Sequence, residues 1–151
     1  GVIVKFVADD AAKANEGFAE MAKNIALQVA AYPNIQYVDR EAVPASVVEE
    51  EMGIIKAQLK NDPKNANKPE QIKEKMIVGR IAKYYEETCL MQQAFVKGDK
   101  ISVEKHVAEV AKAAGGTIAI KGYIRFEKGE GLEKRQDNFA EEIARLTGQA
   151  Q

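Results

Sequence analysis

The stretch from Ala45 to Glu87, "ASVVEEEMGIIKAQLKNDPKNANKPEQIKEKMIVGRIAKYYEE", decides the fold because it predicts two helices joined by one short turn. Residues 45–60 have a single apolar stripe at helical spacing, formed by Val48, Met52, Ile55 and Leu59. Residues 61–70 are polar and punctuated by proline, which is typical of a turn. Helix is then expected to about Glu87, with the apolar residues Met76, Ile77, Ile81, Tyr84 and Tyr85. The two helices should fold back as an antiparallel hairpin.

The residues before this hairpin predict one strand and one helix. "GVIVKFVA" (residues 1–8) is rich in β-branched residues and is expected to be a buried strand. Residues 11–32 change to a helical period, with an apolar side formed by Ala14, Phe18, Met21, Ala22, Ile25 and Val29. Pro33 ends this helix, and residues 35–38 are expected to form a short extended piece before the hairpin begins near Pro44.

The residues after the hairpin predict a helix, a strand region and a last helix. Ser102 is a suitable N-cap for a helix that Gly115 and Gly116 stop, with the stripe Val103, Val107, Val110 and Ala111. "TIAIKGYIRFE" (residues 117–127) alternates and predicts one long strand or two short ones. The last helix is expected from about Leu132 to Leu146, with the apolar side Leu132, Phe139, Ala140, Ile143 and Leu146.

These elements together predict an α+β fold. We expect a small antiparallel sheet of about three strands that is covered by helices, with the helical hairpin projecting from it. At about 1.5 Å per residue, an arm of this length would reach roughly 25 Å from the body. Projecting arms often hold other proteins, although an arm that folds onto its own domain remains the alternative.

Composition limits the class of protein. The 151 residues suit one soluble globular domain, and 22 basic against 23 acidic residues argue against a general nucleic-acid binder. Cys89 is the only cysteine, which excludes an intrachain disulfide and a cysteine-based zinc site and favours reducing surroundings. No apolar stretch is long enough to span a bilayer, and no membrane partner is expected. The sequence begins at Gly1 without a methionine, as expected for a processed form or a piece of a longer protein.

Two short motifs resemble nucleotide or RNA sites, but both depart from the pattern that the chemistry needs. Gly129 and Gly131 follow a strand signal, yet Lys134 occupies the third glycine position, and several glutamates nearby would repel a phosphate. We therefore interpret these glycines as a strand-to-helix turn. "KGYIRFEK" (residues 121–128) begins like an RNA-recognition octapeptide, but Arg125 replaces a base-stacking aromatic. RNA binding is the weaker alternative to an ordinary strand.

Catalytic and metal-binding residues are sparse. His106 is the sole histidine and is interpreted as a solvated surface residue, because it lies beside Glu104 and Lys105. Cys89, next to Leu90, is interpreted as a packed small hydrophobe. No nucleophile, base and acid set can be assembled. We therefore expect no enzyme activity, no cofactor, no metal and no small-molecule substrate.

The helix expected at 11–32 gives the clearest indication of an interaction surface. Asn24, Gln28 and Ala31 flank its apolar stripe as an uncharged shoulder, and Leu27 lies on the otherwise charged side. This shoulder could face a partner protein. The alternative is that these are ordinary surface residues, since scattered exposed apolar groups are common.

Several stretches together resemble one family, the bacterial and organellar translation elongation factor Ts. "NIALQVAAYPNIQYVDREAVPASVVEEE" resembles its helix and following P-x-x-V/I-x-x-E-x-V-P-x-x-V-V-x-x-E passage. "KPEQIKEKMIVGRIAKYYEETCLMQQAFVKGDKISV" resembles its K-P-E-x-I-x-E-K segment and the later L-x-x-Q-x-F-V-K. "YIRFEKGEGLEKRQDNFAEEIA" is similar to its C-terminal R-F-x-x-G-E-G segment. The match is ordered and covers essentially all 151 residues.

The resemblance implies the organisation and the activity of the chain. It implies a single domain with a core subdomain at residues 1–44 and 88–127, a coiled-coil arm at 45–87 and a C-terminal helix module at 128–151. The family is a guanine-nucleotide exchange factor that binds the GDP form of elongation factor Tu, distorts its magnesium and phosphate site and lets GDP leave. The family's N-terminal three-helix domain and Thr-Asp-Phe-Val-Ala wedge segment are not in this sequence. The resemblance therefore implies a C-terminal half that binds factor Tu and exchanges nucleotide weakly alone.

The resemblance also implies partner-binding residues. The core subdomain of the family docks on the third domain of factor Tu, and the last helix reaches the GTP-binding domain. The family helix H-I-A-M-H-V-A-A reads here "NIALQVAA" (residues 24–31), so Gln28 stands where the second histidine takes part in partner contact. The amide of Gln28 can still form a hydrogen bond at this position, but it cannot titrate as a histidine does. The implied partner-binding residues are Asn24, Leu27, Gln28, Ala31, Phe139 and Ile143.

Three further questions stay open from the sequence. The source would be a bacterial cytoplasm or the matrix or stroma of an organelle, either plastid or mitochondrion. The exposed shoulder and the arm leave a homodimer open. A Ts-like structural or ribosome-associated module, whose arm holds another protein, is the competing function.

Overall fold

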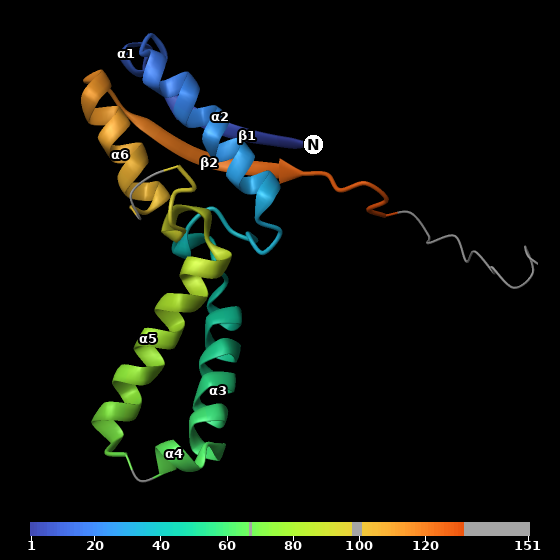
Figure 1. The fold of residues 1–151 in the computed structure, drawn as a ribbon, viewed down its shortest axis with the longest axis vertical. Coiled ribbons are helices and arrows are strands. Elements are labelled where there is room, and N and C mark those ends of the chain that lie inside the picture. Colours follow the sequence, from blue (N-terminus) through green and yellow to red (C-terminus); the bar gives the residue numbers. More distant parts are fainter. Residues whose placement is uncertain (67, 98–100, 132–151) are drawn as a thin grey trace, which may run out of the picture.

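A computed structural model describes residues 1–66, 68–97 and 101–131 of the chain. These residues form a body of helices and a small sheet at one end, and a helical arm that projects along the long axis of the molecule (Figure 1). The expected α+β class is confirmed. The expected last helix, including Phe139 and Ile143, lies outside the described residues.

The sheet pairs the two ends of the described chain. Strand β1 (Val2–Ala8) runs antiparallel to β2 (Ile118–Arg125), with Val2 opposite Arg125 and Ala8 opposite Ile118. The register shifts between Lys5 and Phe6. Residues 117–127 thus give one strand rather than two. Residues 35–38 contribute only a single bridge, between Tyr37 and Cys89, so the described residues contain a two-stranded sheet instead of one with about three strands.

The expected helix at 11–32 is divided into α1 (Asp10–Lys13) and α2 (Glu16–Ala31). The division lies at Asn15, whose side chain accepts a hydrogen bond from the backbone N–H of Gly17 at 2.8 Å and so begins a new helix. The apolar pattern continued through this break, which is why periodicity alone predicted one helix.

Helix α2 and helix α6 (Val103–Ala114) pack with the sheet around one core. Ser102 accepts a hydrogen bond from the backbone N–H of Lys105, and Gly115 ends α6 in the left-handed conformation with φ 66°, as the sequence predicted. The buried core residues are Met21, Ile25, Val29, Ile35, Leu90, Phe95, Val103, Val107 and Ile120.

Hydrogen bonds to the Asp9 side chain link the end of β1 to the start of β2. Its carboxylate accepts hydrogen bonds from the backbone N–H of Ala12 at 2.9 Å and from the N–H and hydroxyl of Thr117 at 2.7 and 3.0 Å. These bonds, led by the one from Ala12, hold the pKa of Asp9 below its usual value. Because the folded-state pKa is lowered, this stabilisation is present at neutral pH and is lost as pH falls through the lowered pKa.

Gly116 has no side chain, and the Asp9 carboxylate occupies the space that a side chain would need. A Cβ atom at this position would overlap Asp9 Oδ1 and lie 3.0 Å from the backbone nitrogen of Ala12. We expect Gly116→Ala to lower the free energy of unfolding by about 1–3 kcal/mol, as overpacking does. Urea unfolding followed by circular dichroism measures this change.

Gly53→Ala is the matched control for that substitution. Gly53 lies inside a helix of the arm, and a Cβ there would meet nothing within 4 Å. This control should raise stability by about 0.5–1 kcal/mol, because alanine has the higher helix propensity. Equal effects at both glycines would contradict the role assigned to Gly116.

The arm is the antiparallel hairpin that the sequence predicted. Helix α3 (Ala45–Asn61) runs away from the body, and α5 (Glu70–Thr88) returns beside it (Figure 1). The polar turn between them contains one short helix, α4 (Pro63–Ala66). A cleft of about 930 Å³ lies between the two long helices and is lined by Met52, Lys56, Leu59, Lys60, Glu70, Lys73, Glu74, Ile77 and Val78.

Candidate functional site

The last turns of α2 carry the residues that the sequence predicted to contact a partner. Leu27 is 51% exposed and Ala31 is also exposed, so both are accessible on the outer side of this helix. Asn24 and Gln28 are buried on its inner side. The expectation that these two amides lie on an exposed shoulder is therefore wrong, because they face the body. Their contact with a partner stays a prediction.

The Gln28 side chain is fully buried and hydrogen-bonded within the chain. Its Nε2 donates to Gln93 Oε1 at 2.9 Å and to the carbonyl oxygen of Ala94 at 3.1 Å. Its Oε1 accepts a hydrogen bond from the backbone N–H of Val96 at 3.3 Å. Gln93 in turn donates to the carbonyl oxygen of Glu87 at 3.3 Å. We call Gln28 and Gln93 the amide pair.

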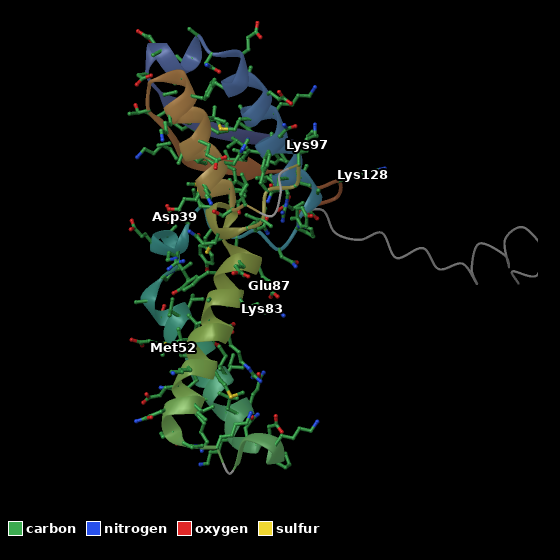
Figure 2. All side chains as sticks on the ribbon, turned by 60° about the vertical axis from the view of Figure 1, so that its left-hand side comes forward. Asp39, Met52, Lys83, Glu87, Lys97 and Lys128 are labelled. Carbon is green, nitrogen blue, oxygen red and sulfur yellow. The ribbon has the colours of Figure 1, made fainter. Side chains whose placement is uncertain are left out.

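The segment held by the amide pair leads into helix α6. The Phe95 ring stacks on His106 with centroids 4.0 Å apart, and the N–H of Phe95 donates to the carbonyl oxygen of Ile101. His106 is half-buried by this contact, so its interpretation as a solvated surface histidine is wrong. Val96, by contrast, is exposed next to Lys97, which Figure 2 shows beside α2.

Sequence reasoning did not assign a role to Gln93 or Val96. A signal was present, because both belong to the L-x-x-Q-x-F-V-K pattern that residues 90–97 resemble. The pattern alone could not show that its glutamine bonds to Gln28, which lies 65 positions earlier in the chain.

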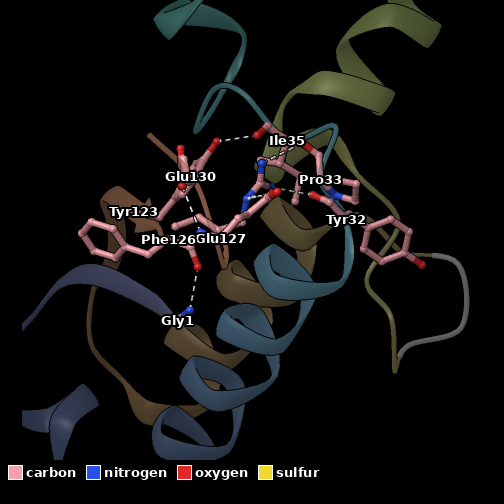
Figure 3. Close-up of polar contacts among 9 residues, drawn as sticks. Gly1, Tyr32, Pro33, Ile35, Tyr123, Phe126, Glu127 and Glu130 are labelled. Carbon is pink, nitrogen blue, oxygen red and sulfur yellow. Dashed lines mark hydrogen bonds and ion pairs between the residues drawn. The ribbon is translucent and has the colours of Figure 1, made fainter. Parts of the chain in front are cut away.

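The end of β2 fixes the loop that follows α2 (Figure 3). The Tyr123 hydroxyl donates to the carbonyl oxygen of Ile35 at 2.8 Å. The Arg125 guanidinium donates to the carbonyl oxygens of Tyr32 and Pro33 at 3.2 and 3.0 Å. A positive charge is favourable at these carbonyls, because the C-terminal end of a helix carries partial negative charge. The exposed end of α2 is therefore held in a defined position.

The base of the arm is bonded to the body by short extended segments. The backbone N–H groups of Gln36 and Tyr37 both donate to the carbonyl oxygen of Thr88, and the N–H of Leu90 donates to Tyr37 at 3.0 Å. Leu90 belongs to the 3-10 turn η2 (Leu90–Gln92), and a second such turn, η1 (Arg40–Ala42), precedes the arm. These bonds fix the direction in which the arm leaves the body.

The ion pairs described on the arm are largely exposed, and only Lys73, which pairs with Glu70, is half-buried. Lys83 Nζ and Glu87 Oε1 lie 3.7 Å apart on α5, where Figure 2 shows both side chains near the base. Such surface pairs contribute little to stability. The arm is therefore held mainly by its base and by Ile55 and Leu59, which are buried.

Cys89, Gly129 and Gly131, which the sequence analysis considered for chemistry, have structural roles. Cys89 is fully buried, as predicted for a packed small hydrophobe, and burial raises the pKa of its thiol. Gly129 and Gly131 both have positive φ, at 84° and 74°, which fits their interpretation as turn residues.

Among the described residues, no cluster of three or more histidines, cysteines and carboxylates could hold a metal. None of the described helices is both long enough and apolar enough to cross a membrane.

Comparison with known proteins places the chain in a family. A sequence model of the family described as Elongation factor TS matches residues 1–130. Over 124 residues the chain is 52% identical to elongation factor Ts of Symbiobacterium thermophilum, covering 82% of this chain and 39% of that protein. Over 149 residues it is 40% identical to elongation factor Ts of Clostridium botulinum, covering 99% of this chain and 46% of that protein. The chain thus spans less than half the length of these relatives. The chain belongs to the elongation factor Ts family.

Proposed function

We propose that this chain binds elongation factor Tu in its GDP form through the exposed side of α2 and contributes to guanine-nucleotide exchange in protein synthesis. The observation that carries this proposal is the exposure of Leu27 and Ala31 on α2, within the segment that resembles the partner-contacting helix of the family. Leu27 lines a shallow, mainly apolar groove with Val2, Ala30 and Phe126, and an exposed apolar patch of this kind is typical of a site that binds a protein partner. We expect the chain to act by binding, because its sequence offers no set of nucleophile, base and acid.

Exchange by this chain alone is expected to be weak. Its sequence has no Thr-Asp-Phe-Val-Ala segment, and the family uses that segment near the magnesium site of factor Tu. Asp9, the first acidic residue of the chain, is engaged with Ala12 and Thr117 and cannot replace that wedge. Docking and exchange should therefore separate in this chain. Its bacterial relatives favour the bacterial cytoplasm as the place of action.

The two competing functions have less support. A ribosome-associated structural module would use the arm, whose cleft combines apolar side chains such as Met52 and Ile77 with charged ones such as Lys60, but no family motif assigns a partner to it. RNA binding would need Tyr123 free to stack on a base, whereas its ring is half-buried and its hydroxyl is bonded to Ile35. Exposed Ile3, Val7 and Ile124 on the outer side of the sheet leave self-association as a homodimer a further expectation.

Titration of the chain into factor Tu that carries a fluorescent GDP analogue tests the proposal. The expected result is saturable binding with a GDP release rate that rises far less than with a complete Ts protein. No binding at micromolar protein, which corresponds to about −8 kcal/mol or weaker, would overturn it. Titration of the chain with single-stranded RNA at several salt concentrations tests the RNA alternative, since binding through phosphate contacts would weaken steeply with salt.

A further inference from the structure

The Gln28 amide has no spare N–H to offer a partner. A glutamine side chain has two N–H donors and one carbonyl acceptor. Both donors are used, by Gln93 Oε1 and by the carbonyl oxygen of Ala94, and the acceptor is used by the N–H of Val96. The reverse orientation of the amide would place its oxygen against two other oxygens. The side chain is also 0% exposed, so it acts inside the body.

The three bonds connect α2 to a segment that has no regular secondary structure of its own. The carbonyl oxygen of Ala94 and the N–H of Val96 both bond to Gln28, so this side chain holds the backbone of residues 94–96 against α2, while the N–H of Phe95 bonds to Ile101. Phe95 between them points inward to the core, where it stacks on His106. Val96 consequently points outward and is 47% exposed beside α2.

We infer that Gln28 is a positioning residue for partner binding, because it fixes residues 94–96 against α2 and so adds Val96 to the surface of Leu27 and Ala31. This inference rests on the proposed function, since it names how that same surface is built. Gln28 acts on the partner only through Val96. The surface is therefore formed by two segments, an exposed helix side and a loop, joined from within by the amide pair.

A near-isosteric apolar substitution isolates this role. Gln28→Met keeps the length of the side chain and removes all three hydrogen bonds, which leaves Gln93 Oε1 unpaired in a buried place and frees the Ala94 oxygen and the Val96 N–H from α2. The segment should then open toward water, and Val96 should lose its fixed position. Gln36→Met is the matched control, because Gln36 is exposed and lies on the same body.

The test combines hydrogen exchange of the free chain with binding to factor Tu·GDP. We expect Gln28→Met to speed exchange of the Val96 amide at least tenfold and to weaken the dissociation constant about tenfold, with Gln36→Met unchanged. Val96→Ala should weaken binding about fivefold, and the double variant should be no weaker than about tenfold, because both changes remove the same contact.

The outcomes distinguish failure of the proposed function from failure of the inference alone. If the unaltered chain does not bind factor Tu, the proposed function fails, and the inference fails with it. If the unaltered chain binds and the losses of Gln28→Met and Val96→Ala multiply, Gln28 acts independently of Val96 and the inference is wrong. Val96→Ala truncates an exposed side chain, so it remains decisive if Gln28→Met does not fold: binding equal to that of the unaltered chain would overturn the inference.

Discussion

Replacing Leu90 with alanine is expected to lower the free energy of unfolding by about 2–5 kcal/mol, the range found for buried leucines. Leu90 is 0% exposed and lies in the core formed by α2, α6 and the sheet. It also follows the arm directly, and its N–H donates to the carbonyl oxygen of Tyr37. The cavity would therefore form where the arm joins the body, among closely packed neighbours such as Ile35 and Phe95. Chemical unfolding at neutral pH measures the loss.

Leu27→Ala is the matched control, because it makes the same change at an exposed position. Leu27 is 51% exposed, so its truncation removes little buried area and should change stability by less than about 0.5 kcal/mol. A small effect at Leu90 would show that the junction between arm and body collapses around the missing side chain. It would contradict the assignment of Leu90 to the core.

Replacing Leu27 with aspartate is expected to weaken binding to factor Tu at least thirtyfold, about 2 kcal/mol, while the chain stays folded. An aspartate would place an unpaired charge where the proposed interface excludes water, and burying such a charge is costly. The free chain tolerates the change because the side chain points away from the core. Isothermal titration with factor Tu·GDP, together with a thermal melt of the free variant, measures both effects.

Ile3→Asp provides the comparison on another surface. Ile3 is 63% exposed on the outer side of β1, whereas α2 packs on the inner side of the sheet. This variant should bind factor Tu like the unaltered chain. Equal losses at Leu27 and Ile3 would indicate a general effect of added charge, and unchanged binding at Leu27 would remove α2 from the proposed interface.

Helix α2 has two functions that are divided between its sides. Its inner side places Met21, Ile25 and Val29 in the core, and its outer side presents Leu27 and Ala31. The amide of Gln28 is also buried on the inner side and bonds to the segment at residues 94–96. We therefore expect a substitution on the inner side of this helix to affect stability or the position of residues 94–96, and one on the outer side to affect the proposed partner contact.

Local chemistry let the sequence determine most elements of this fold. Ser102 and Gly115 mark the ends of α6, because a hydroxyl can cap free N–H groups and glycine adopts positive φ without strain. The hairpin was predicted from two apolar stripes around a polar turn. The break at Asn15 was missed, because the apolar period runs through it and only the bond to Gly17 begins a new helix.

The tertiary structure alone decided which polar side chains face inward. Gln28 and His106 resemble surface residues in their local sequence, yet Gln93 and Phe95 cover them. Residues 35–38 form a single bridge with the end of the arm instead of a strand in the sheet. In each case the deciding partner lies tens of residues away, and no local propensity reports such a contact. The sequence by itself therefore determined the elements and the family, whereas packing between distant segments decided how the candidate surface is built.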